Sequence, residues 1–180
     1  DSLQRDLPRR EIIETNRLKE DILNTLCDAS EQLQKSFRVK PDKIYVILGT
    51  PWSHAELHSV IYKSKHDFKF TEKFGMKIIS SELSKLSKKD EKLMLTDHRT
   101  VEVLLNGYTS PNPNGKLCRT VELHCLCSFS DRDLLTMIAD KLHRYWKTKL
   151  FFTSTAFRDF MIVRDMPGGD RGATVINVGA

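Results

Sequence analysis

The chain lacks any long hydrophobic run. No stretch of its 180 residues approaches the roughly 18 consecutive apolar positions that cross a bilayer, so we do not expect a membrane-spanning protein. The first residues, Asp1-Ser2-Leu3, include neither an initiator Met nor the apolar core of a secretory signal peptide. We therefore interpret the sequence as a fragment of a longer protein.

The sequence also lacks the common catalytic motifs. It contains no G-x-S-x-G nucleophile elbow, no H-E-x-x-H metal pair and no Walker-type glycine-rich loop. Among the six histidines, only His54 and His58 are four residues apart, and we expect them to share a face only if their segment is helical. That segment is more typical of a loop entering a strand, so we predict surface histidines and no catalytic residue.

Cysteines are few, and their pattern argues against a metal site. Cys125 and Cys127 alternate with polar residues in the segment 120–129, which places both in the apolar face of a strand. His124 then faces the other way, so a zinc knuckle is not supported. Free cysteine is a good small core residue, and reduced thiols are typical of cytoplasmic proteins. We predict core cysteines and a cytoplasmic location.

Charge of one sign is only slightly in excess. The sequence has 29 Lys and Arg against 24 Asp and Glu, a formal net charge of +5. The densest stretch of lysine, Lys85 to Lys92, also contains Asp90 and Glu91. Nucleic-acid-binding proteins usually concentrate their charge on one face. We therefore rank a nucleic-acid-binding α/β domain last among the alternatives, and expect no nucleic-acid partner.

Apolar periodicity predicts helices and strands in a mixed order, which defines a mixed α/β fold class. Helices are expected at 9–37, 71–86, 130–146 and 156–164, and strands at 43–49, 57–62, 100–108, 116–129, 150–153 and 173–180. Thr71 is the expected N-cap of the second helix, and Ser130-Asp131 of the third. The second helix should bury one stripe: Met76, Ile79, Leu83 and Leu86.

Three short segments resemble a signature of bacterial actin-like proteins, the family that includes the cell-division protein FtsA and the type IV pilus protein PilM. They are Val101–Tyr108, the turn Asn112-Pro113-Asn114-Gly115-Lys116, and Val121-Glu122-Leu123. In that family a strand ending near a Tyr leads through an N-P-x-G turn into another strand. The resemblance follows the family order over about residues 40–180.

This resemblance implies an actin-like (ribonuclease H-like) fragment with an inserted strand–helix–strand–strand subdomain. The implied divisions are an N-terminal helix (1–40), the inserted subdomain (41–129), the return to the main actin-like subdomain (130–172) and the start of a second ATPase subdomain (173–180).

The resemblance also implies ATP and Mg²⁺ binding in the full-length parent. Residues 174–179 resemble the second phosphate strand, which would place Asn177 and Gly179 near the nucleotide or metal. The family usually has Asp where this chain has Asn177, and an amide supplies no charge to offset the metal. We therefore expect impaired hydrolysis in the parent, and neither cofactor nor activity in the fragment alone.

For the inserted subdomain, the family implies binding of a protein partner. That partner would be a membrane-anchored division or pilus component, or a second copy of the chain, so membrane contact would be peripheral at most, at the inner face of the cell membrane. We predict a partner-binding surface containing Trp52, Tyr108, Asn112, Pro113 and Gly115, because aromatic residues are enriched in binding hot spots. The alternative is that Trp52 and Tyr108 are packing residues.

Two functions from different classes remain open. The first is an actin-like nucleotide switch in bacterial cell division or type IV pilus assembly. The second is an interaction scaffold without ATPase function.

Overall fold

The computed structural model describes residues 14–36 and 41–165. The described part divides into two compact units, with divisions between residues 46 and 47, 131 and 132, and 151 and 152. The elements are α1 (Thr15–Ser36), β1 (Lys43–Leu48), β2 (Ser53–Lys69), α2 (Glu72–Lys89), β3 (Leu93–Leu105), β4 (Tyr108–Thr109), β5 (Leu117–Asp131), α3 (Arg132–Tyr145), β6 (Lys149–Ser154) and α4 (Thr155–Asp165). This mixture of helices with two sheets confirms the predicted α/β class.

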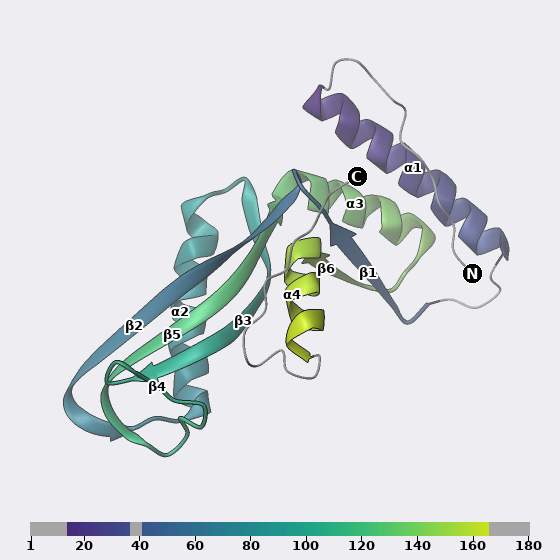
Figure 1. The fold of residues 1–180 in the computed structure, drawn as a ribbon. Coiled ribbons are helices and arrows are strands. Elements are labelled where there is room, and N and C mark those ends of the chain that lie inside the picture. The colour runs from purple at the N-terminus through teal and green to yellow at the C-terminus, as the bar shows by residue number, and fades with distance from the viewer. Residues whose placement is uncertain (1–13, 37–40, 166–180) are drawn as a thin grey trace. The chain divides into compact units, whose positions relative to one another are not determined.

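The larger unit, residues 47–131 and the described part of 152–165, is built on a four-stranded antiparallel sheet. Its strand order is β2-β5-β3-β4, so β5 is central and β2 forms one edge. Helix α2 runs along one face of this sheet (Figure 1). We call that face the inner face and the opposite one the outer face.

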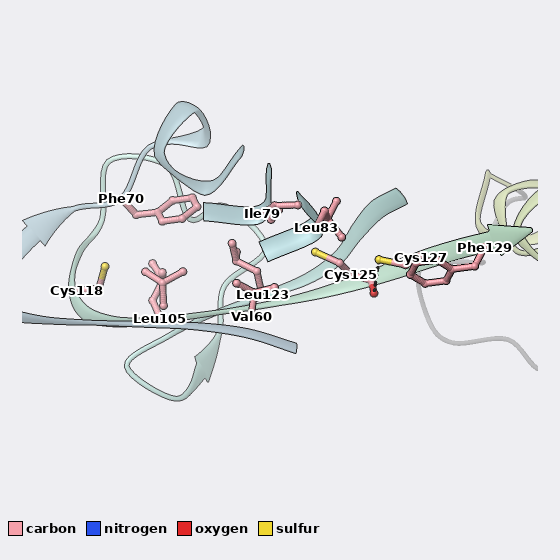
Figure 2. Packing of buried hydrophobic residues seen from close by; sticks show 11 residues of the cluster. Val60, Phe70, Ile79, Leu83, Leu105, Cys118, Leu123, Cys125, Cys127 and Phe129 are labelled. Carbon is pink, nitrogen blue, oxygen red and sulfur yellow. Dashed lines mark hydrogen bonds between the residues drawn. The ribbon is translucent and has the colours of Figure 1, made fainter. Parts of the chain in front are cut away.

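Side-chain alternation along β5 creates the core of this unit. Val121, Leu123 and Cys125 are at most 1% exposed and point to the inner face, as the period of a strand requires. The full buried cluster, drawn in Figure 2, adds further residues of β5 and residues of β2, β3, α2 and the β2–α2 connection: Val60, Phe70, Ile79, Leu83, Leu105, Cys118, Cys127 and Phe129. The predicted core placement of Cys125 and Cys127 is confirmed.

Helix α2 begins where the sequence predicts. Thr71 is the N-cap, and its Oγ1 accepts a hydrogen bond from the Phe74 backbone N–H at 3.2 Å. Two expectations for this helix were wrong. Met76 is 62% exposed, because the helix presents Phe74, Ile78 and Ile79 to the sheet. The helix also continues through Lys89, three residues beyond the expected end at residue 86.

A close contact at the start of α2 requires glycine. Phe70 is 3% exposed, and its ring lies under the first turn of the helix. A Cβ added at Gly75 would lie 2.9 Å from Cζ of Phe70, closer than real Cβ contacts. The missing side chain therefore lets the ring and the helix backbone approach each other.

Helix α4 packs against β2 and β5 and covers part of the sheet. Three serines on the outer face are buried where β2 begins and β5 ends: Ser53, Ser128 and Ser130. Their small side chains permit the helix to approach. Ser154 caps α4, since its Oγ accepts a hydrogen bond from the Phe157 N–H at 3.1 Å.

The smaller unit, the described part of residues 1–46 and 132–151, pairs α1 with α3. Leu23 of α1 and four residues of α3 are buried in it: Leu134, Leu135, Ile138 and Leu142. Tyr145 Oη donates to Glu31 Oε1 at 3.2 Å, which connects the two helices. The rings of Tyr45 in β1 and Phe151 in β6 stack with centroids 5.2 Å apart.

Several element bounds differ from the sequence expectations. Ser130 and Asp131 end β5, where both continue the pairing with neighbouring strands, and α3 begins directly after them at Arg132. Strand β2 runs for 17 residues where a short strand at 57–62 was expected. His54 and His58 do share a face, although the segment is not helical: residues four apart in a strand also point the same way, and both rings contact Phe129. The predicted domain divisions at 40/41, 129/130 and 172/173 stay predictions.

Replacing Gly75 with Ala should destabilise the larger unit. The new methyl group would clash with Phe70, and such overpacking costs roughly 1–3 kcal/mol, more than the roughly 1 kcal/mol gained from the better helix propensity of Ala. Urea unfolding of Gly75→Ala measures the loss, with Ser80→Ala on the exposed side of α2 as the matched control. A Gly75→Ala variant at least as stable as the parent would contradict the packing described for Phe70.

The thiols should differ sharply in reactivity. Cys118, Cys125 and Cys127 are at most 1% exposed, whereas Cys27 is partly exposed on α1. Burial raises the pKa of Cys127 to about 12, and it also raises the pKa of Cys125 and Cys118. A disulfide reagent should label Cys27 in the native chain and the other three thiols only after unfolding. Loss of native-state labelling in Cys27→Ser checks this assignment, and rapid labelling of that variant would refute it.

Candidate partner-binding surface

The outer face of the sheet is open beyond α4. Leu57 and Ile61 of β2 lie there with 58% and 57% of their surface exposed. Leu57 is paired with the half-buried Leu126 of β5, and Ile61 with Glu122. Because antiparallel partners point to the same side, these residues form one surface. We call Leu57, Ile61, Glu102, Glu122 and His124 the open face.

A hydrogen-bonded network crosses the open face from β5 to β4. His124 Nε2 contacts Glu122 Oε1 at 2.8 Å, and His124 Nδ1 contacts Glu102 Oε2 at 3.1 Å. The second oxygen of Glu102 accepts a hydrogen bond from Thr109 Oγ1 at 2.8 Å. Together these contacts connect side chains from three neighbouring strands, β5, β3 and β4, so the polar part of the face is held in one arrangement.

An irregularity in β3 directs Glu102 into this network. Thr100 pairs with Cys125, but Glu102 pairs with His124, so Val101 is an extra residue in β3. In a regular strand Glu102 would point the same way as Thr100, toward the inner face. The bulge reverses this order and places Glu102 beside His124, while Val103 returns to the core cluster.

The two carboxylates favour the charged imidazolium of His124. The hydrogen bond to Glu122 raises the pKa of His124 above 6.5, partial burial opposes this, and the charges of Glu122 and Glu102 add to the increase. These side chains are partly exposed, so water competes for their hydrogen bonds. The network therefore contributes only modestly to the free energy of folding.

Neither metal binding nor nucleophilic catalysis is supported at this surface. The two ring nitrogens of His124 point in different directions and each contacts a carboxylate, so the three groups do not converge on one point. Within residues 14–36 and 41–165, no group of His, Cys, Asp and Glu side chains could hold a metal ion. The thiols on the inner face are buried and disfavoured as thiolates.

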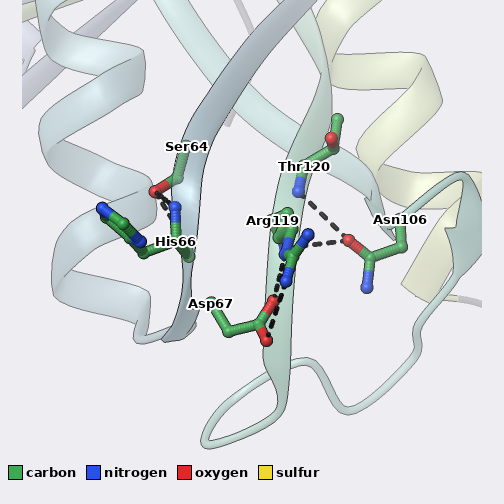
Figure 3. Close-up of polar contacts among 6 residues, drawn as sticks. All are labelled: Ser64, His66, Asp67, Asn106, Arg119 and Thr120. Atoms are coloured by element: carbon green, nitrogen blue, oxygen red, sulfur yellow. Dashed lines mark hydrogen bonds and ion pairs between the residues drawn. The ribbon is translucent and has the colours of Figure 1, made fainter.

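Tyr108 follows a tight hairpin turn. Asn106 and Gly107 have positive φ angles of 53° and 86°, and Leu105 pairs directly with Tyr108, as in a two-residue type I′ turn. Asn106 Oδ1 also accepts hydrogen bonds from the N–H groups of Arg119 and Thr120, at 2.8 and 3.1 Å (Figure 3). The hairpin is thereby fastened to β5, and Tyr108 is left 79% exposed.

The turn residues predicted for the partner surface lie next to this hairpin. Asn112 is exposed and Pro113 is half-buried. Gly115 adopts φ 82°, and its N–H donates to the Phe70 carbonyl at 2.8 Å. The Phe70 N–H in turn donates to the Lys116 carbonyl, so the loop is joined to the start of α2.

Trp52 is not near these residues. Its carbonyl accepts a hydrogen bond from the Asp131 N–H at one end of β5, whereas Tyr108 pairs with Leu105, which pairs with Val121. Ten residues of strand separate Val121 from Asp131, which is about 33 Å. Trp52 and Tyr108 therefore lie at opposite ends of the sheet and do not form one small site.

Two predicted residues are not covered by the structure. Asn177 and Gly179, expected near a nucleotide, lie outside the described residues.

In the described part, no helix is long and apolar enough to cross a membrane.

Sequence reasoning missed the open face. The signal available for it was the alternation along β2, where Leu57 and Ile61 share a parity with Ser53 and Ser59. The position of Glu102 had no such signal, because a strand pattern does not mark where a bulge occurs.

The contribution of His124 to the stability of the folded chain should depend on pH. Its folded-state pKa is raised, so the stabilisation is complete below about pH 6.5, the ordinary value of the unfolded chain, and is lost as the pH rises through the higher folded value. A double-mutant cycle of His124→Gln and Glu122→Gln should give a coupling of roughly 0.2–1 kcal/mol at about pH 5.5, and a smaller one at about pH 8.5. Equal coupling at the two pH values would show that the ion pair is not formed.

Comparison with known protein families finds none whose model matches the chain, and comparison with curated proteins finds no match. The case for a function therefore depends on the surface of the molecule itself.

Proposed function

We propose that this chain is a protein-interaction module of an actin-like protein of the FtsA/PilM kind, acting in bacterial cell division or type IV pilus assembly. Its larger unit holds a protein partner on the open face of the sheet. The partner is a membrane-anchored component of such a machine or a second copy of the chain.

The observation that carries the proposal is the exposure of Leu57 and Ile61 on an ordered sheet face. Single exposed apolar residues are common on monomers, but here two residues of β2 share one face with the half-buried Leu126 of the neighbouring strand β5. Covering the exposed part of each side chain would contribute roughly 1 kcal/mol. Helix α4 already covers the neighbouring part of this face, so the sheet is able to receive a packed element there.

The polar network beside the apolar pair suits a protein partner. Fixed carboxylates and a fixed imidazole offer hydrogen-bonding groups whose positions do not need to be ordered on binding, which lowers the cost of association. An apolar centre with a polar border is also the usual composition of such interfaces. Residues 41–129 contain the succession β2, α2, β3 and β5 together with two further strands, β1 before it and β4 within it, so the strand–helix–strand–strand subdomain stays an expectation from the resemblance.

Nucleotide binding belongs to the proposal only for a longer parent chain. Its support is the resemblance of residues 174–179 to a phosphate strand, with Asn177 where the family usually has Asp. ATP and Mg²⁺ would bind in the parent, and the described residues provide no part of that site. The scaffold without ATPase function remains the alternative.

Removing the apolar pair should abolish partner capture. The Leu57→Ser/Ile61→Ser variant changes exposed positions, so we expect it to fold and to retain less than a tenth of the proteins that the parent chain captures from an extract of its own cells. Quantitative mass spectrometry of the captured proteins measures retention, and sedimentation velocity measures self-association.

The matched control is Met76→Ser/Ile162→Ser, which removes two side chains with 62% and 50% exposure elsewhere on the same unit. It should capture partners as the parent does. Equal capture by both double variants, or no specific capture by the parent chain, would rule out the open face as the partner site.

A further inference from the structure

One end of the larger unit carries the net charge of the chain. At this end β2 turns into α2 and the β3–β4 hairpin meets the start of β5 (Figure 1). We call residues 62–77 and 106–119 the tip. The tip has seven Lys and Arg against two Asp and Glu, a net charge of +5 equal to that of the whole chain. The remaining residues contain 22 of each sign and are neutral in sum.

The fold creates this concentration by bringing two distant segments together. The Phe70 N–H donates to the Lys116 carbonyl at 2.9 Å, and the Asn106 N–H donates to the Thr120 carbonyl at 2.8 Å. The seven cations are exposed, and they are Lys63, Lys65, Lys69, Lys73, Lys77, Lys116 and Arg119. Among the described residues, the tip contains one ion pair, between Arg119 and Asp67 at 2.6 Å (Figure 3).

Exposed apolar side chains lie in the same two segments as these cations. Tyr108 is 79% exposed in β4, and Leu117 is 64% exposed at the start of β5. The backbone at both positions is held by hydrogen bonds. The turn before Tyr108 is bonded to β5 through Asn106, and Leu117 is paired with Lys69 of β2. Tyr62 adds a partly exposed ring, which packs edge-on against Phe68 and Phe74. The tip is therefore both basic and apolar.

We propose that the tip docks on an anionic lipid surface. Lysines would lie at the level of the headgroups, and Tyr108 and Leu117 would enter the interfacial region, where tyrosine is favoured. Neither attraction alone gives stable membrane binding, but a basic patch combined with apolar insertion does. This function goes beyond partner binding and uses a different part of the unit from the open face.

The composition of the tip favours lipid over nucleic acid. Base recognition relies on the planar fork of arginine and on exposed rings for stacking, whereas lysine binds any phosphate as a point charge. Here the only arginine is held by Asp67, six of the seven cations are lysines, and Tyr108 is the one strongly exposed ring. Lysines act as point charges toward a charged plane, and the exposed Leu117 has no role in binding a phosphate backbone.

Vesicle co-sedimentation of the full chain tests the proposal. We expect binding to phosphatidylcholine vesicles with about a third phosphatidylglycerol, no binding to phosphatidylcholine alone, and weakening with salt. Lys65→Gln/Lys69→Gln/Lys73→Gln should bind at least tenfold more weakly, because each lysine near an anionic surface contributes about fivefold. Tyr108→Ser/Leu117→Ser should also bind more weakly while keeping the salt dependence of the parent chain.

The matched control removes three lysines at the other end of α2 and the start of β3. Lys85→Gln/Lys88→Gln/Lys92→Gln changes the net charge equally and should leave vesicle binding unchanged. Equal weakening by the two lysine variants, unchanged binding of Tyr108→Ser/Leu117→Ser, or no binding of the parent chain would each overturn the proposal. So would tip-dependent binding of a single-stranded oligonucleotide or of polyglutamate without binding to anionic vesicles. Circular dichroism and urea unfolding verify that each variant is folded.

Discussion

The period of two along β5 is the constraint on which the larger unit depends. This strand is paired on both sides, so each of its side chains must point to the inner or the outer face. Val121, Leu123, Cys125 and Cys127 point inward and are fully buried. The intervening residues therefore cannot join the core, and the second face has to be polar, covered or available for binding.

The outer face uses all three of these possibilities. Ser128 and Ser130 are small and buried on the side where α4 packs. His124 and Glu122 satisfy one another and Glu102. Leu57 and Ile61 remain exposed. One alternating strand thus determines where the helix packs and which part of the sheet is left for a partner.

Much of the fold was predictable because its signals are local. The Thr71 cap, the alternation around Cys125 and the turn at 112–116 each depend on neighbouring residues, and the structure contains all three. Met76 was assigned to the core because it fits a helical stripe with Ile79. A helix lying on a sheet buries a stripe set by the sheet, which here includes Phe74 and Gly75.

The candidate surfaces could not be predicted, since both are created by pairing between distant segments. Glu102 reaches His124 only because Val101 is an extra residue in β3. The charge of the tip was not visible in the sequence, where lysines look evenly spread and the segments 62–77 and 106–119 are far apart. Trp52 and Tyr108 show the reverse case: both lie in the segment 41–129 that was predicted to form one subdomain, yet a long strand separates them.

The two surfaces are compatible within one unit because they make different demands. The open face lies along the strands, where a rigid hydrogen-bonded network and an apolar pair suit a packed protein element. The tip lies at one end of the strands, where β2, the start of α2 and the start of β5 supply its charge. Under the two proposals, the larger unit would bind a protein partner along its strands and a lipid surface at their end, so the lipid contact would orient the open face toward components beside the membrane. This follows from the direction of the strands, which carry the first surface along their length and the second at their end.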